Sequence, residues 1–250
     1  MSEKQLGIVV LAAGQGKRMN NPDIPKVLAE LKCKPLIAYL IDQIVKLNPS
    51  ECIFVVGHQK EKVEKFVSAY IGNKFKFNFA HQMQQLGTAN AVGCSKEYLN
   101  NFVGNVLILC GDVPLLKVET LNNFIENHIS EKADLSVLSM IAPNPKGYGR
   151  IIRNELNSFN TIIEEKDASD SQKLINEVNS GVYLVDSKIL FEALSKVKNE
   201  NAQKEYYLTD IVSIALNEGK KVIASSFGNF NQLRGINTHE ELVAIEKLLD

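Results

Sequence analysis

The chain has 250 residues, of which 45% are hydrophobic, and its 28 basic and 29 acidic side chains leave a formal charge of −1. That length and composition are sufficient for a sizeable core, in one large domain or in one domain with a small lobe. The near-neutral balance argues against broad binding of nucleic acid or of an anionic membrane surface, whereas local basic residues can still bind a small anion. We therefore expect neither nucleic acid nor membrane among the partners.

The cysteines and the N-terminal segment bound the cellular context. The four cysteines are widely spaced and form no C-x-x-C pair, so the signatures of zinc ribbons and thioredoxins are absent: Cys33, Cys52, Cys94 and Cys110. We expect reduced, mostly buried thiols. The apolar run at residues 7–13 is too short to cross a bilayer and is typical of a buried strand rather than a signal sequence. These features predict a cytoplasmic protein.

The first half of the chain alternates between strand and helix patterns. Apolar runs predict strands at residues 6–11, 52–56, 75–80, 106–110 and 134–141, and apolar residues at helical spacing predict helices at 36–47, 61–70, 88–99 and 118–129. Runs that are apolar on both faces suit the central strands of a parallel sheet. The alternation at about 20–30 residues predicts an α/β fold with a doubly wound, mostly parallel sheet.

The pattern changes after Pro143. Residues 143–149 form a loop rich in proline and glycine, and short strands are predicted at 150–153, 161–164 and 181–185. We expect these three strands to build a small mixed sheet over one edge of the main sheet. Helices are predicted at 189–197 and 207–217, a strand at 222–226, and a last helix from Thr238. The interpretation is one domain over residues 1–250, with halves of about 1–115 and 116–237 and a C-terminal helix at 238–250.

A glycine-rich loop with basic residues follows the first strand. The small residues let backbone N–H groups approach an anion closely, and Lys17 and Arg18 add positive charge. Lys26 is the next basic residue and could reach the same phosphates. A dinucleotide fingerprint would require glycine at Met19, and a Walker A loop would require serine or threonine at Arg18. The segment therefore predicts a phosphate-binding loop of another type.

Asp112 is a carboxylate that comes just after a predicted buried strand. It follows the strand at 106–110 and Gly111, and ligands of open α/β sheets bind at the carboxyl ends of the strands. Magnesium is commonly held by a single carboxylate together with phosphate oxygens and water. The alternative is a turn residue before Pro114, but the position favours a ligand of Mg²⁺.

These motifs together resemble those of the sugar-nucleotide pyrophosphorylases. The matching segments are residues 11–19, 25–28, 82–89, 111–115, 147–150, 163–168, 179–181, 205–210 and 234–237, so that the resemblance spans about residues 6–240. The uridyltransferases that act on N-acetylglucosamine 1-phosphate in bacteria are the most similar branch. The resemblance implies a Rossmann-like nucleotidyltransferase fold, with a nucleotide-binding first half and a sugar-phosphate-binding second half.

The resemblance also implies roles for individual residues in nucleotide binding. Arg18, Lys26 and Asp112 are the expected catalytic residues. Gln82, with Gly87 and Thr88, is expected to read uracil, because a glutamine amide offers both a donor and an acceptor. Thr88 is in addition expected to cap the helix that it begins. The full expected nucleotide-binding set is Leu11, Ala12, Ala13, Gly14, Gly16, Lys26, Gln82, Gly87, Thr88 and Gly111.

The second half is implied to bind the sugar phosphate and to complete the metal site. Gly149 would contribute its backbone, Glu164 and Asn179 would bind sugar hydroxyl or acetamido groups, and Lys166 would lie near a phosphate. Asn237 is the implied second ligand of Mg²⁺ beside Asp112. Its alternative role, as N-cap of the last helix, can be filled by its neighbour Thr238. Residues 205–210 are expected to begin a buried helix near the pocket.

Two departures from the family limit what can be transferred. Cys110 stands where a tyrosine is often found, which removes one contact near the ligand. The sequence ends at Asp250 without the hexapeptide repeats of the acetyltransferase domain that the bifunctional bacterial enzymes carry. Acetyl transfer and the trimer built by that domain are therefore not expected. The oligomeric state stays open, with a monomer among the options.

The expected reaction is an in-line attack by a sugar 1-phosphate oxygen on the α-phosphorus of UTP, with release of pyrophosphate and with Mg²⁺ as cofactor. It requires alignment and charge neutralisation but no protein nucleophile. N-acetylglucosamine 1-phosphate is the first choice of sugar; the glucose and N-acetylgalactosamine 1-phosphates remain open. One alternative is a cytidylyltransferase that acts on a polyol or sugar phosphate, because the amide of Gln82 can rotate. The other is a silent nucleotide-sugar sensor, which would not need Lys26, Asp112 and Asn237 together.

Overall fold

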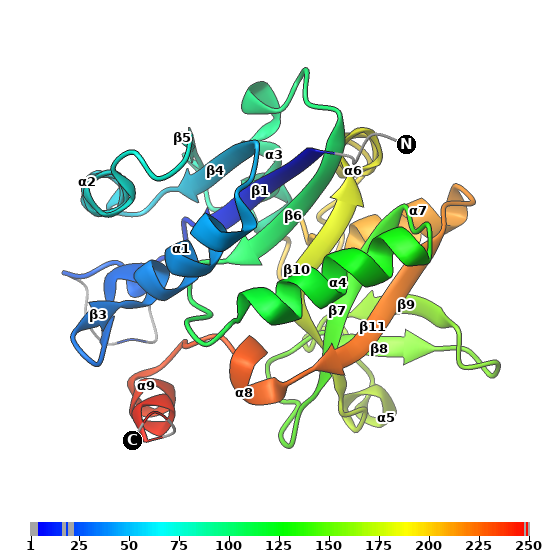
Figure 1. Ribbon diagram of the computed structural model, residues 1–250. Coiled ribbons are helices and arrows are strands. Elements are labelled where there is room, and N and C mark those ends of the chain that lie inside the picture. The colour runs from blue at the N-terminus through cyan, green and yellow to red at the C-terminus, as the bar shows by residue number, and fades with distance from the viewer. Residues whose placement is uncertain (1–4, 17–18, 20–22, 248, 250) are drawn as a thin grey trace.

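The computed structural model describes residues 5–16, 19, 23–247 and 249, and the two basic residues Lys17 and Arg18 lie outside these ranges. A mixed sheet runs through the described chain in the order β11-β7-β10-β6-β1-β4-β5, with β8 and β9 attached through β10 (Figure 1). Its strands are β1 (Gln5–Ala12), β4 (Glu51–Val56), β5 (Asn78–His81), β6 (Gly104–Cys110), β7 (Leu135–Ile141), β8 (Arg150–Arg153), β9 (Phe159–Ile163), β10 (Glu177–Asp186) and β11 (Val222–Gly228).

Most neighbours along the sheet are parallel. Strand β1 pairs in parallel with β4 and β6, β4 with β5, and β11 with β7, whereas β10 runs antiparallel to both β6 and β7. The predicted α/β fold with a mostly parallel sheet is confirmed. Because β1 and β6 run the same way, both end at one edge of the sheet, the edge at which Gly111 and Asp112 follow β6.

Helices cover both faces of the sheet. Successive residues of a strand point to opposite sides, so a strand that is apolar throughout has two apolar faces to bury. On β1, Ile8 and Val10 pack into one core and Val9 into the other. The first core is covered by α1 (Leu36–Leu47), α2 (Lys60–Ile71), α4 (Val118–Ser130) and α8 (Phe230–Leu233); the second is covered by α3 (Thr88–Gly93), α6 (Ser187–Leu194) and α7 (Asp210–Asn217). Figure 1 shows α1 and α4 lying across the front of the sheet.

The prediction for β10 was wrong in both length and place. The expected short strand at 181–185 in the small sheet is a ten-residue strand in the middle of the main sheet. Its residues from Val182 to Val185 are all buried, as in a strand covered on both faces. A bulge between Asn179 and Val182, at which Gly181 has a φ of 82°, interrupts the pattern and makes the strand look short.

The small additional β lobe is confirmed as the hairpin of β8 and β9, which joins the main sheet where Arg150 pairs with Val178. The expected helix at 88–99 is α3 followed by the 3-10 turn η3 (Lys96–Tyr98), since the Ser95 hydroxyl donates to the Val92 carbonyl (2.7 Å) and ends the helix. The remaining elements are η2 (Lys26–Leu28), the hairpin of β2 (Glu30–Leu31) and β3 (Lys34–Pro35), α5 (Asp170–Lys173) and α9 (His239–Glu246).

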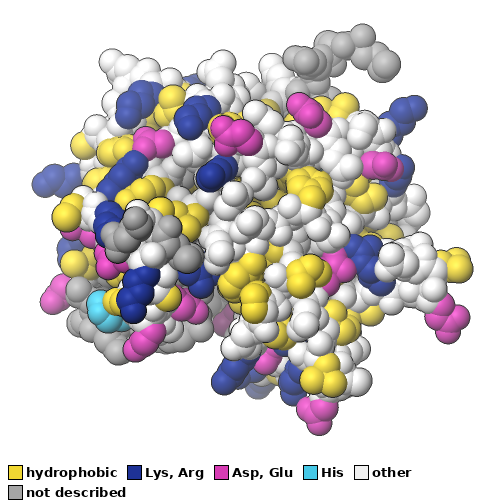
Figure 2. Space-filling model, turned by 60° about the horizontal axis from the view of Figure 1, so that its bottom comes forward, with side chains coloured by type: hydrophobic (Ala, Val, Ile, Leu, Met, Phe, Trp, Pro, Cys, Tyr) yellow, Lys and Arg dark blue, Asp and Glu magenta, His cyan; other side chains and the backbone are white. Residues whose placement is uncertain are grey.

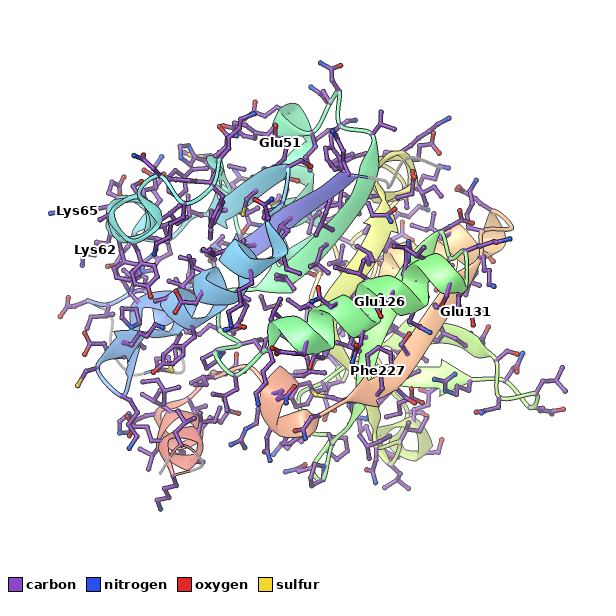
Figure 3. The ribbon with its side chains drawn as sticks, viewed as in Figure 1. Glu51, Lys62, Lys65, Glu126, Glu131 and Phe227 are labelled. Atoms are coloured by element: carbon purple, nitrogen blue, oxygen red, sulfur yellow. The ribbon has the colours of Figure 1, made fainter. Side chains whose placement is uncertain are left out.

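The surface carries charges of both signs together with exposed apolar side chains. On the face shown in Figure 2, basic and acidic side chains are interspersed. Lys62 and Lys65 point outward from α2, and Glu131 at the end of α4 pairs with Lys221 at 3.2 Å (Figure 3). Within the described ranges, none of the helices combines the length and the apolar character that a membrane crossing requires.

All four cysteines are free thiols, but only one of them is fully buried. Cys52 lies in β4 and is inaccessible, whereas Cys94 and Cys110 are half-buried. Cys33 is exposed in the turn between β2 and β3, so the expectation of mostly buried thiols is wrong there. Lys32 and Cys33 both have a positive φ in this surface turn, 49° and 59°.

Candidate functional site

A pocket of about 300 Å³ opens at the carboxyl edge of β1 and β6, a size suited to a small molecule. The turn after β1 forms one wall, the segment around Gln82 and the start of α3 form another, and Asp112 closes the end near β6. Nine residues predicted from the sequence line it together: Leu11, Ala12, Ala13, Gly14, Lys26, Gln82, Gly87, Thr88 and Asp112. Gly111 is buried behind them, where its N–H donates to the Leu11 carbonyl at 2.9 Å.

The ammonium group of Lys26 brings two distant side-chain oxygens together. It forms an ion pair with Asp112 and donates to Oδ1 of Asn237 at 3.0 Å. The side chains of Lys26 and Asp112 are only 16% and 14% exposed, so water screens this pair weakly. The partners lie 86 and 211 residues from Lys26 in the sequence. Oxygens of Asp112 and Asn237 thus converge on a single cationic atom.

Backbone hydrogen bonds hold Asp112 and Asn237 in place. The N–H of Ile236 donates to the carbonyl of Asp112 at 3.0 Å and ties the last loop to the end of β6. Asn237 stands just before the capping box of α9, in which Thr238 is the N-cap and the Glu241 carboxylate accepts from the N–H groups of both Asn237 and Thr238. Thr238 therefore caps α9 as predicted, and Oδ1 of Asn237 accepts from Lys26 instead.

The side-chain oxygens of Asp112 and Asn237 suit a hard cation. Two oxygens, one of them anionic, already meet at one positive charge. Among the described residues, His, Cys, Asp and Glu nowhere gather in threes as a ready-made metal cage. A divalent ion bound to Asp112 and Asn237 would take its remaining ligands from water and from phosphate oxygens, which is the usual arrangement for Mg²⁺.

The turn after β1 packs against the stem of Lys26. Gly16 has a φ of 62°, and a Cβ placed on it would lie 2.7 Å from Cβ of Lys26. The turn therefore requires glycine both for its left-handed backbone and for this close approach. Lys17 and Arg18 follow immediately, so the catalytic role predicted for Arg18 falls on a residue outside the described ranges.

Gln82 presents a fixed amide at the far end of the pocket. Its side chain is 6% exposed, and Nε2 donates to the Gly87 carbonyl (3.0 Å) and to Oδ1 of Asn90 (2.9 Å). Gly87 has a φ of 116°, and a Cβ there would lie 2.5 Å from the Tyr206 carbonyl oxygen, so only glycine fits. Gln85, which sequence reasoning did not single out, donates to the Ala13 carbonyl (2.8 Å) and closes the wall.

The capping role predicted for Thr88 is wrong. The N-cap of α3 is Gly87, and no side chain caps the helix. The hydroxyl oxygen of Thr88 instead accepts from the N–H of Leu208 at 2.9 Å. The backbone N–H of Ala89 donates to the Tyr206 carbonyl at 2.9 Å. Residues 205–210 therefore brace the start of α3 beside the pocket and lead into α7, which begins only at Asp210 and has no side-chain cap.

Three of the predicted sugar-phosphate residues form a second cluster. The N–H of Asn179 donates to the Gly149 carbonyl at 2.9 Å, and the Thr209 hydroxyl donates to Glu164 at 3.1 Å. Asn179 in turn donates to the hydroxyl of Tyr183 at 2.7 Å and accepts from the N–H of Gly181 at 3.0 Å. Nothing in the sequence distinguished Tyr183 from an ordinary core residue.

Lys166 is not part of this cluster. It is exposed on the turn after β9, and its side chain forms no hydrogen bond or ion pair with another described residue. Arg150, next to Gly149, is by contrast 1% exposed and pairs with Glu165 at 2.6 Å. The segment was recognised from the sequence, but the buried residue within it was missed.

Cys110 joins the cluster to the pocket. Its thiol lines the pocket and donates weakly to the Gly181 carbonyl at 3.8 Å, two residues from Asn179. Burial and, to a lesser degree, the neighbouring Asp112 carboxylate raise the pKa of Cys110 to about 12. The thiol therefore stays protonated at neutral pH and is a poor nucleophile.

Fold and site together define an α/β protein in which a lysine paired with an aspartate and a glycine turn face a small-molecule pocket at the carboxyl edge of the sheet. A family model described as nucleotidyl transferase matches residues 8–231. The chain belongs to the nucleotidyl transferase family, and it is a nucleotidyltransferase enzyme by that membership.

Curated relatives agree with this assignment, and a solved structure shares the fold. The chain is 41% identical over 98% of its length to the bifunctional protein GlmU of Geotalea daltonii and 40% identical over 96% to that of Bacillus subtilis. It spans about half the length of these relatives, 52% and 51%. A crystal structure of UDP-glucose pyrophosphorylase complexed with UDP-glucose has the same fold, with a TM-score of 0.79, 18% identity and 98% coverage of both chains.

Proposed function

We propose that the protein transfers a uridylyl group from UTP to N-acetylglucosamine 1-phosphate, forming UDP-N-acetylglucosamine and pyrophosphate with Mg²⁺ as cofactor. Membership of the family and about 40% identity to proteins named GlmU support the class of reaction. The observation that carries the proposal is the convergence of Asp112 and Asn237 on the Lys26 ammonium beside the glycine turn. Phosphate-transfer chemistry needs oxygen ligands for a divalent cation and a positive group near the phosphates, and these residue types can supply both.

The state of Gln82 supports uracil over cytosine. Because both contacts of its Nε2 are to acceptors, the free amide atom facing the pocket is the oxygen. An oxygen accepts from the N3–H group of uracil, whereas the N3 atom of cytosine is itself an acceptor and would be repelled. The geometry thus favours UTP between the two nucleotides that the sequence left open.

The residues of the chain would act mainly by positioning and by charge. Lys26, held beside Asp112, would move onto the phosphates of the nucleotide and neutralise charge as pyrophosphate leaves. Backbone N–H groups of the turn at residues 13–16 would hold the same phosphates, and Arg18 would add a second cation. When bound to Asp112 and Asn237, Mg²⁺ would supply Lewis-acid stabilisation and orientation of the phosphate oxygens.

The second cluster is the proposed site for the sugar 1-phosphate. Glu164 offers an acceptor for sugar hydroxyls, and Asn179 keeps one N–H of its amide for the ligand, because the other donates to Tyr183 and the oxygen is bound by Gly181. An array of such fixed polar groups discriminates among sugars more sharply than an apolar wall. Lys166 is retained as a residue that a bound phosphate could attract.

The direct test is a panel of nucleoside triphosphates and sugar 1-phosphates, scored by release of pyrophosphate with and without Mg²⁺. We expect turnover with UTP and N-acetylglucosamine 1-phosphate, weaker turnover with the glucose and N-acetylgalactosamine 1-phosphates, and loss of activity on chelation of the metal. A higher kcat/KM with CTP would identify a cytidylyltransferase instead. Binding of UDP-sugars without pyrophosphate from any pair would identify a sensor.

Glu164 gives a prediction about pH. Burial raises the pKa of its carboxyl above the ordinary value, and the hydrogen bond from Thr209 only partly opposes the shift. As pH falls through this raised pKa the carboxylate is protonated and loses acceptor strength, so we expect KM for the sugar 1-phosphate to rise. Glu164→Gln should raise this KM about tenfold at neutral pH, the usual loss for a hydrogen bond to a charged group.

The measurement is KM for the sugar 1-phosphate at saturating UTP from roughly pH 5 to 8, a range around ordinary carboxyl and phosphate titrations. The substrate phosphate titrates in the same way with the parent and with Glu164→Gln. The difference between their two curves of KM against pH therefore reports Glu164. The curves should converge toward acid pH. Parallel curves, with no convergence, would remove Glu164 from sugar binding.

A further inference from the structure

Asn90 lies behind the pocket and contacts Gln82. It belongs to α3, one turn after Gly87, and it is absent from the residues that line the pocket. Its Oδ1 accepts from Nε2 of Gln82 at 2.9 Å. Because Asn90 does not face the nucleotide site, any effect it has on a ligand must pass through the side chain of Gln82.

The direction of the Gln82 amide follows from its partners. The carbonyl of Gly87 can only accept, so the Gln82 atom at 3.0 Å from it must be the nitrogen. The second N–H of that nitrogen then points to Asn90, whose amide can turn to present its oxygen. Among the described residues, no donor reaches Oε1 of Gln82, although the side chain is 6% exposed and lines the pocket. Oε1 is therefore the atom of this amide that remains for a donor group on a ligand.

We propose that Asn90 is a specificity-determining, positioning residue: it locks the amide of Gln82 with the oxygen toward the base and so sets the preference for UTP over CTP. This inference rests on the proposed function. To accept cytosine, Gln82 must turn its amide by about half a turn, which breaks the bond to Gly87 and keeps a bond to Asn90 only if the Asn90 amide gives up its own orientation as well. Each of these bonds therefore adds to the penalty against CTP.

The preference for UTP over CTP should depend on whether the side chain at position 90 can accept a hydrogen bond. In Asn90→Ala and Asn90→Leu the second N–H of Gln82 loses its acceptor and rotation of the amide costs less. We expect the ratio of kcat/KM for UTP to that for CTP to fall about five- to tenfold, the value of one buried hydrogen bond. Asn90→Asp supplies an acceptor that cannot turn into a donor, so its ratio should equal or exceed that of the parent.

The experiment measures kcat and KM for UTP and CTP in the parent, the three variants and Asn100→Ala, which changes an exposed asparagine of the next turn. The change should lie mostly in KM, because Gln82 binds the base and not the reacting phosphates. Alanine is the best helix former, so Asn90→Ala should fold, and a thermal melt checks this. Asn100→Ala should leave the ratio unchanged.

Two results would overturn the inference. If Asn90→Ala and Asn90→Leu keep the parent ratio within about twofold, the hydrogen bond has no bearing on base choice. If Asn90→Asp loses selectivity as far as Asn90→Leu does, an acceptor at this position is not the cause. A parent that prefers UTP in either case leaves the proposed function intact, whereas a parent without UTP turnover removes both.

Discussion

Replacing Asp112 with alanine is expected to lower kcat by roughly 10²–10³, the range for removal of one strong electrostatic group from a reaction centre. The carboxylate is the charged member of the pair of oxygens that meets at Lys26. Its loss removes the anionic ligand proposed for Mg²⁺ and frees the ammonium group from its position. Asp112→Asn keeps an oxygen without the charge and should fall between the parent and the alanine variant.

The measurement is pyrophosphate release at a series of Mg²⁺ concentrations, which separates weakened metal binding from a slower chemical step. Asp42→Asn is a matched control, because Asp42 also pairs with a lysine, Lys34, and accepts from Tyr70 at 3.0 Å, on α1 away from the pocket. That pair is about a third exposed, so its loss should cost less than about 1 kcal/mol and leave turnover unchanged. Near-normal turnover of Asp112→Ala would refute the role of this carboxylate.

The architecture was largely predictable because burial leaves a strong pattern. Strands such as β4 and β6 are apolar on both faces, and α1 carries its apolar residues at helical spacing after Pro35. The length and place of β10 were predicted wrongly for two reasons. The bulge at Gly181 breaks its pattern, and an antiparallel strand between parallel neighbours has no separate sequence signal. The four-residue helices α5 and α8 are too short to show a period.

The site was predictable in its composition but not in its contacts. Position at strand ends favoured Asp112, whereas the meeting of Asp112 and Asn237 at Lys26 depends on a loop that returns from the far end of the chain. The family resemblance, not the spacing, brought Asn237 into the prediction. The direction of the Gln82 amide was left open, because it depends on a carbonyl and on Asn90, whose distances no sequence pattern reports.

Arg150 is a second example of contacts that the sequence did not predict, because only Gly149 of the motif at residues 147–150 was assigned a role. Its guanidinium donates to the carbonyls of Tyr148 and Lys173 and pairs with Glu165. These partners belong to the loop before β8, the end of α5 and the turn after β9, three segments that surround the proposed sugar cluster. A planar fork with several donors can hold three segments at once, which a lysine ammonium cannot reproduce.

Arg150→Met is therefore expected to lower the free energy of unfolding by about 2–4 kcal/mol, because it removes a buried guanidinium from two carbonyls and from the Glu165 carboxylate. Arg150→Lys should recover only part of that loss. Arg153→Met, on the same strand, should cost less, because the Arg153 side chain is 23% exposed compared with 1% for Arg150. Urea unfolding with an unchanged slope measures the difference.

The same variants should separate the two substrates kinetically. Gly149 adjoins Arg150, and Glu164 precedes its partner Glu165, so loosening these segments should raise KM for the sugar 1-phosphate several-fold, an effect of about 1 kcal/mol. KM for UTP should change little, because the pocket at the end of β1 and β6 shares no residue with the contacts of Arg150. Equal increases in both constants would mean that Arg150 supports the whole fold rather than the sugar cluster, and no loss of stability would show that the guanidinium is not the tie between the three segments.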